Sequence, residues 1–291
     1  ESKGVRLGLE ILMCCILLGS LLGATVYSVW HLRRSRRQLA DVDLTAVLGA
    51  ADMRIDGMLL SRLRDGSLKL LRCDWLASES ADAILGRDAD GAVLIKRQQE
   101  LPDEAFVPRE EAAALLEAGD RSILVLSYGW LTALHPDPHG TTLAAVRRYL
   151  ASGKGGVGIF WDYTSLPQKD EGGYRSAADT TIFQRGLGVM GSLYASITGT
   201  SVLQQRDIVL PPGAATGEGG YTNPTPYDGD EGRGWCIFEQ GVSMTVLAHL
   251  TAAERQAEEK GRALPQRFQR AQAARAKVYD IGGVAPVARE C

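Results

Sequence analysis

The central part of this sequence alternates between two kinds of apolar pattern, and this alternation limits the folds that the chain can adopt. Short, nearly uninterrupted apolar runs are typical of buried strands, and they occur at 122–128 and 156–162, while a third short strand-like run stands at 200–204. Each run precedes a segment whose apolar residues recur every three or four positions, as on a helix face, at 141–150, 181–197 and 235–250. Strands that alternate with helices form a parallel sheet with helices on both faces. We therefore predict an α/β domain over 121–250.

Polar and aromatic side chains stand where the predicted strands end. Ser127 and Tyr128 end the first run, and Asp162 ends the second. The third run is followed by a Gly- and Pro-rich loop that leads to Trp235 at the start of the last helix. Because sites in parallel sheets form beyond the carboxyl ends of the strands, we expect these residues to converge.

An uncharged run near the N-terminus predicts one membrane-spanning helix. Residues 11–30 carry no charged side chain, and about twenty apolar residues suffice to cross a ~30 Å hydrocarbon core. A cleaved signal peptide is the alternative, but its apolar region is usually only about 7–15 residues long. A basic block follows the run, with Arg33, Arg34, Arg36 and Arg37. By the positive-inside rule, residues 1–37 then form a single-pass anchor in the lipid bilayer that leaves the rest of the chain in the cytosol.

The segments on either side of 121–250 carry weaker patterns. We interpret residues 38–120 as a membrane-proximal extension with short strand-like runs at 67–73 and 92–98 and a helix over 108–119. Residues 251–291 are predicted to be a charged helical tail, in which "KVYDI" (277–281) is the only further strand candidate.

Charge and residue spacing argue against several functions. A formal net charge of −3 is too near neutral for a typical nucleic-acid-binding protein. The five cysteines show no CxxC spacing, and His135 and His139 flank two prolines in a predicted loop, so we expect no metal site. The Gly-rich segment around Lys154 lacks the Ser or Thr of a phosphate-binding loop.

The stretch "WCIFE" (235–239) places an indole and a carboxylate four residues apart at the start of a predicted helix. Residues at this spacing share one helix face, and the helix dipole favours the charged form of an acid in the first turns. Two interpretations are open for Glu239: a working carboxylate beside Trp235, or an acid that merely suits the helix start. Cys236 is interpreted as a packing residue, because no histidine lies near it in the sequence.

Three motifs of the central region together resemble a known family. "ILVLSY" (123–128), "GIFWD" (158–162) and "WCIFE" resemble the three characteristic boxes of TIR domains, the Toll/interleukin-1 receptor and plant-resistance signalling module. The resemblance covers roughly 121–250 and implies a flavodoxin-like, three-layer parallel sheet. "LPDEAF" (101–106) and "FWDYTSLPQ" (160–168) also resemble segments of uncharacterised algal or protist proteins, some of them membrane proteins.

The resemblance also implies a chemistry. Enzymatically active TIR domains cleave the nicotinamide–ribose bond of NAD with a glutamate that corresponds here to Glu239. The residues expected to shape the substrate pocket are Trp235, Ser127, Tyr128 and Asp162. NAD would be a substrate, and no cofactor is expected.

Two other functions stay open at this point. Many TIR domains are non-catalytic interaction or adaptor modules, and an α/β domain that binds nucleotides without TIR ancestry is a third interpretation. Self-association is expected through the TIR-like domain and through Gly19 and Gly23, whose GxxxG spacing lets two membrane helices approach closely.

Overall fold

The computed structural model describes residues 42–132, 135–208, 226–227 and 233–290. The chain divides into two compact units, residues 1–47 and 48–291. In the first unit, Asp43 Oδ1 accepts hydrogen bonds from the backbone N–H groups of Thr45 (3.1 Å) and Ala46 (3.2 Å), near the beginning of α2 (Leu44–Asp65). The description below concerns the second unit.

Six strands form one sheet in the order β1-β5-β4-β6-β7-β8. Their bounds are β1 Leu71–Arg72, β4 Ile123–Ser127, β5 Gly158–Phe160, β6 Thr200–Gln204, β7 Val278–Asp280 and β8 Val287–Ala288. β5, β4, β6 and β7 run parallel, whereas β1 and β8 pair antiparallel with β5 and β7. The prediction of an α/β fold with a mostly parallel sheet is confirmed. A separate hairpin joins β2 (Gly86–Arg87) to β3 (Val93–Leu94).

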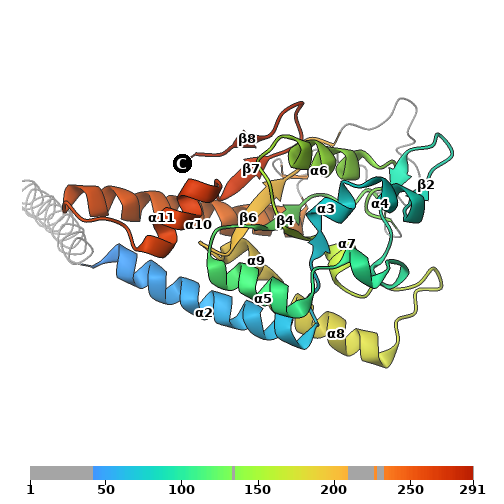
Figure 1. Cartoon of the computed structure of the whole chain (residues 1–291), viewed down its shortest axis with the longest axis horizontal. Helices are drawn as coiled ribbons and strands as arrows, with labels where there is room; N and C mark the ends of the chain where they lie inside the picture. The colour runs from blue at the N-terminus through green and yellow to red at the C-terminus, as the bar shows by residue number, and fades with distance from the viewer. Residues whose placement is uncertain (1–41, 133–134, 209–225, 228–232, 291) are drawn as a thin grey trace, which may run out of the picture. The chain divides into compact units, whose positions relative to one another are not determined.

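Helices cover both faces of the sheet because side chains along each strand alternate between two cores. On β4, Leu124 and Leu126 enter one core, and Ile123 and Val125 enter the other. The first core is closed by α3 (Cys73–Leu76), α4 (Glu79–Ile84) and α6 (Thr141–Ala151). The second is closed by α2, α5 (Arg109–Ala118), α9 (Met190–Ala195) and α10 (Gly234–Glu259). Figure 1 shows α6 on one side of the strands and α5 on the other.

Short elements complete the described fold. They are the helices α7 (Asp162–Ser165), α8 (Ala177–Leu187) and α11 (Gln266–Ala274), and the 3₁₀ turns η1 (Gln98–Glu100) and η2 (Asp103–Ala105). α7 begins shortly after β5: the strand ends at Phe160, Trp161 is the N-cap of the helix, and Asp162 is its first residue.

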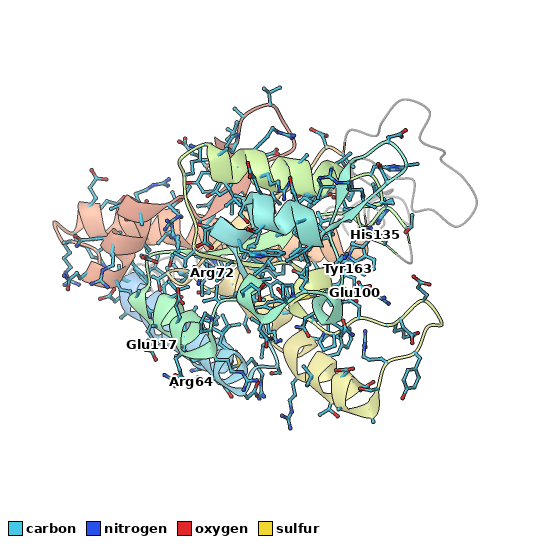
Figure 2. The ribbon with its side chains drawn as sticks, turned by 45° about the vertical axis from the view of Figure 1, so that its right-hand side comes forward. Arg64, Arg72, Glu100, Glu117, His135 and Tyr163 are labelled. Atoms are coloured by element: carbon cyan, nitrogen blue, oxygen red, sulfur yellow. The ribbon has the colours of Figure 1, made fainter. Side chains whose placement is uncertain are left out.

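Polar contacts attach α2 to the rest of the second unit. Asp52 accepts hydrogen bonds from the backbone N–H of Ile197 (2.7 Å) and from Thr198 Oγ1 (2.5 Å), just before β6. Arg64 on α2 and Glu117 on α5 form an ion pair with 2.6 Å between Nη2 and Oε1, and both are labelled in Figure 2. Because Asp52 is buried, its hydrogen bonds to Ile197 and Thr198 contribute more to stability than the exposed ion pair.

The segment predicted as one helix over 181–197 is two helices, α8 and α9. The break lies at Gly188 and Val189, which are the C-cap of α8 and the N-cap of α9. Glycine favours the helix less than other residues. Within α8, Gly186 packs closely: a β-carbon there would lie 2.3 Å from Leu166 Cδ2 and 2.7 Å from the Ser67 carbonyl oxygen.

The sheet takes strands from both sides of the predicted domain 121–250. β1 comes from the segment 38–120, and the sequence from 251 to 291 contributes β7 and β8 as well as α11. The strand candidate at 277–281 contains β7, and β8 is a further strand in the segment predicted to be a helical tail. Val278 and Tyr279 are buried, and Val278 pairs with Val202 of β6, so the tail packs as part of the core.

Within the part of the chain that the structure describes, no helix combines the length and the apolar character needed to cross a membrane. The predicted span at 11–30, with Gly19 and Gly23, lies outside the described residues.

Candidate functional site

A pocket of about 600 Å³ lies where β4 and β5 end and α10 begins. This volume is in the usual range for small-molecule sites. Its polar lining includes Tyr128, Asp162, Gln168, Tyr194 and Glu239, and its apolar lining includes Trp130, Leu166, Phe183, Met190 and Trp235. The strand ends therefore do converge on one site, as the sequence predicts for a parallel sheet.

Glu239 lies in the second turn of α10, and its side chain points into the interior of the protein. The residue is only 7 % exposed. Its Oε2 atom accepts a hydrogen bond of 2.6 Å from Ser127 Oγ at the end of β4. The same Ser127 oxygen lies 2.7 Å from the Tyr227 hydroxyl. A buried chain of hydrogen bonds thus runs from Tyr227 through Ser127 to Glu239.

Burial changes the acidity of Glu239. Desolvation raises the pKa of this carboxyl to about 8, hydrogen bonds from Ser127 and Tyr194 oppose the rise, and the charge of Asp162 adds to it. The helix dipole favours the charged form of Glu239, whereas desolvation, the largest influence on its pKa, favours the protonated form.

Asp162 holds the aromatic wall of the pocket. Its Oδ1 atom accepts from the Tyr128 hydroxyl (2.8 Å) and from the backbone N–H of Tyr163 (2.7 Å), and its Oδ2 atom accepts from Trp130 Nε1 (2.9 Å). Burial raises the pKa of Asp162, while these hydrogen bonds from Tyr128, Trp130 and Tyr163 lower it. Both carboxylate oxygens accept hydrogen bonds from the protein, so Asp162 positions the Tyr128 and Trp130 rings at the pocket.

The beginning of α10 forms the mouth of the pocket. Trp235 is 59 % exposed there and meets the Phe238 ring edge-on at 5.9 Å between centroids. The Arg233 guanidinium donates a hydrogen bond to the Trp130 carbonyl, and the Arg233 N–H donates to the Pro226 carbonyl at 2.8 Å. Arg233 thereby attaches the start of α10 to the loop that follows β4.

Cys236 lies beside Glu239 but is not poised as a nucleophile. Its Sγ atom lies 3.3 Å from the Tyr128 carbonyl oxygen, and burial raises the pKa of the thiol to about 12. A thiol with this pKa stays protonated at neutral pH, so the geometry agrees with the interpretation of Cys236 as a packing residue.

Four of the five predicted site residues line the pocket, namely Tyr128, Asp162, Trp235 and Glu239. Ser127 differs from the prediction of a substrate contact, because it is 0 % exposed and lies behind Glu239. It positions the carboxyl group instead.

Sequence reasoning missed several residues of this site. Tyr194 belongs to a helical apolar stripe, and such a stripe indicates only core packing. Trp130 stands just after the end of the first predicted strand, and only this position in the sequence suggests that it belongs to the site. Tyr227 follows a loop without periodicity, so no pattern could place it beside Ser127.

His135, considered above as a metal ligand, is held by contacts within the protein. His135 Nε2 lies 2.9 Å from the Ile95 carbonyl oxygen, and Nδ1 accepts a hydrogen bond from the Asp137 N–H at 3.1 Å. The centre of its ring lies 5.2 Å from that of Tyr163, and both residues are labelled in Figure 2. Among the described residues, no group of three His, Cys, Asp or Glu side chains is arranged to hold a metal ion.

Comparison with known proteins finds no matching family model, no matching curated protein and no matching solved structure.

Proposed function

We propose that this chain hydrolyses NAD to nicotinamide and ADP-ribose, with Glu239 as the catalytic carboxylate. The observation that carries the proposal is the position of Glu239, which is buried, lines the pocket and is oriented by Ser127. An acid that served only the start of α10 would instead be expected to project into solvent. Strongly shifted acids in pockets are typical of functional sites.

The topology is consistent with the family that the motifs resemble. Numbered along the chain, the four parallel strands have the spatial order 2-1-3-4, as in the flavodoxin-like fold. We propose that the domain is TIR-like on this order and on the three motifs. Fold alone does not imply function, so the catalytic part of the proposal depends on the site.

The proposed reaction breaks the bond between the nicotinamide nitrogen and the ribose carbon. The bonding electrons leave with nicotinamide, which becomes neutral, while positive charge develops on the ribose. Deprotonated Glu239 stabilises that charge, as carboxylates do in glycoside cleavage. Water then adds to the ribose carbon and loses a proton, which gives ADP-ribose.

The lining of the pocket suits a flat aromatic leaving group. Tyr128, Trp130 and Trp235 provide ring surfaces near the carboxyl group. Aromatic side chains pack against such a ring in offset or edge-on arrangements. In the proposed complex these rings hold nicotinamide while Glu239 faces the ribose.

The test is release of nicotinamide from NAD by the full chain at high protein concentration, followed by chromatography. Glu239→Gln keeps the size and the acceptor for Ser127 but cannot become negative, so the rate should fall by about a hundredfold or more. Glu258→Gln is the matched control, because Glu258 is an exposed acid farther along α10. Full activity of Glu239→Gln would contradict the proposal.

A non-catalytic interaction module is the second candidate, favoured by a different observation. Trp235, Ile237 and Phe238 are all exposed at the start of α10, and exposed apolar residues that lie together are typical of protein contacts. If no nicotinamide is released and Trp235→Ala abolishes self-association, this function replaces the enzymatic one.

We also propose that residues 11–30 anchor the chain in a membrane with the α/β domain in the cytosol. The uncharged run and the following arginines support this orientation. Protease added to sealed vesicles with the cytosolic face outward should digest the domain. Complete protection of the domain would contradict this topology.

A further inference from the structure

Aromatic rings and acids dominate the described lining of the pocket. Two carboxyl groups, Asp162 and Glu239, lie among aromatic side chains. Arg233 is the cationic residue among the described lining, and its guanidinium is directed to the Trp130 carbonyl. Aromatic faces and carboxylates both attract organic cations.

The groups that face Glu239 leave the charge of its carboxylate uncompensated. From β4 and α9 come the hydroxyls of Ser127 and Tyr194, and residue Tyr227 adds a third hydroxyl through Ser127. From α10 comes the protonated thiol of Cys236, and beyond β5 lies Asp162, whose charge is negative.

Two arginines lie nearby, and neither is among the groups that shift the pKa of Glu239. Arg233 lowers the pKa of Cys236, and the Arg206 guanidinium lies 6.0 Å from the centre of the Tyr227 ring. Because a buried carboxylate needs a counter-charge, a proton on Glu239 fills that role in the structure described here. A cation of suitable shape would make the same compensation.

We propose that the pocket recognises a cationic pyridinium ring by its charge, and that binding of this ring releases one proton from Glu239. The choice of nicotinamide as the pyridinium ring rests on the proposed function. The inference itself concerns binding of the ring and not cleavage of its bond to ribose. On binding, a neutral carboxyl group and a cation become an ion pair, and one proton passes to the solvent. Neutral nicotinamide, the product, has no charge to hold the carboxylate and rebinds weakly.

The probe is 1-methylnicotinamide, a permanent cation without the ribose bond that NAD hydrolysis would break. Titration calorimetry of the full chain at pH 7 in two buffers of different ionisation enthalpy counts the protons released. We expect close to one proton per ligand, because a carboxyl group with a pKa of about 8 is mostly protonated at that pH. Affinity should rise about tenfold per pH unit until pH 8 and then level off. Neutral nicotinamide should release no proton.

Two variants separate Glu239 from other sources of protons. Glu239→Gln resembles the protonated form, so 1-methylnicotinamide should bind it weakly and without proton release at any pH. Glu258→Gln, the exposed acid on the same helix, should behave like the wild type. Circular dichroism of Glu239→Gln checks that the variant is folded.

The outcomes distinguish this inference from the proposed function. Binding of 1-methylnicotinamide without proton release, equal affinity for neutral nicotinamide, or no binding by a chain that hydrolyses NAD would each overturn the inference and leave the hydrolase in place. Proton release on binding by a chain that does not hydrolyse NAD would support the inference and overturn the hydrolase.

Discussion

Ser127 Oγ and Glu239 Oε2 lie 2.6 Å apart, and this hydrogen bond joins the end of β4 to the second turn of α10. The two residues are separated by 112 positions in the chain. The direction of the Glu239 carboxyl group is therefore set by the packing of α10 on the sheet, and not by α10 alone.

Removal of the Ser127 hydroxyl should change the acidity of Glu239. This hydrogen bond lowers the pKa of Glu239, so Ser127→Ala should raise that pKa further and move the midpoint of the pH–rate profile to higher pH. Nicotinamide release at pH 7 should fall accordingly. Ser201→Ala is the matched control: Ser201 is a buried serine on β6 that donates to the Ala276 carbonyl instead. An unchanged midpoint in Ser127→Ala would contradict the positioning role.

Hydrolysis by the wild-type chain should depend on pH in the alkaline range. The proposed reaction uses the carboxylate form of Glu239, and burial raises the pKa of this group to about 8. At low NAD concentration the rate should therefore rise about tenfold per unit from pH 6 to pH 7, then level off above pH 8. Initial rates of nicotinamide release measure this profile. A rate that falls over that range would show that a protonated group carries the reaction.

Glu239→Gln should stabilise the fold at alkaline pH. The native pKa of Glu239 lies above the ordinary value of 4.5, so the native state holds the extra proton between pH 4.5 and about 8, and stability falls as pH rises through that window. The glutamine has no proton to lose. Its melting temperature should match that of the wild type at pH 4 and exceed it by several degrees at pH 8.5. Equal melting temperatures at pH 8.5 would mean that Glu239 is well solvated.

Asp162→Asn should loosen the aromatic wall. The amide keeps one acceptor oxygen but turns its NH₂ group toward either the Tyr128 hydroxyl or the Trp130 indole, each of which now donates to Asp162. One buried donor then lacks its acceptor, at a cost of about 1–3 kcal/mol in stability. We expect KM for NAD to rise more than kcat falls, because the rings bind the leaving group. A loss confined to kcat would assign Asp162 to the chemical step.

A pair of glycine substitutions tests the close packing at Gly186 on α8. Gly186→Ala should destabilise the protein, because its β-carbon would lie 2.3 Å from Leu166 Cδ2 and 2.7 Å from a backbone oxygen. Gly241→Ala on α10 should stabilise it by about 0.5–1 kcal/mol, because nothing lies within 4 Å of its β-carbon. Chemical denaturation compares the two. The same sign of change in both would argue against the packing at Gly186.

The predictable part of this fold is the part with strong local patterns. The apolar run at 122–128 contains β4, and every residue of β4 is buried. β1 and β8 have only two residues each, too few for any periodicity. They become strands because a neighbouring strand offers hydrogen bonds.

The site divides in the same way. The sequence places Tyr128, Asp162, Trp235 and Glu239 at the ends of elements that a parallel sheet brings together. The burial of Glu239 depends on Tyr194 and Ser127 from other elements, so its acidity could not be read from α10, where the dipole argument predicts the opposite direction. The local sequence pattern therefore predicts which residues form the site, but not the raised pKa of Glu239.

The strands at the two ends of the sheet have a consequence for any shorter piece of this protein. β1 covers the outer side of β5, and β7 covers the outer side of β6. A polypeptide limited to 121–250 would leave the backbone N–H and C=O groups of β5 and β6 unpaired on opposite sides. Exposed strand edges recruit strands from other molecules. Such a fragment should therefore precipitate, although it retains every residue of the TIR-like motifs.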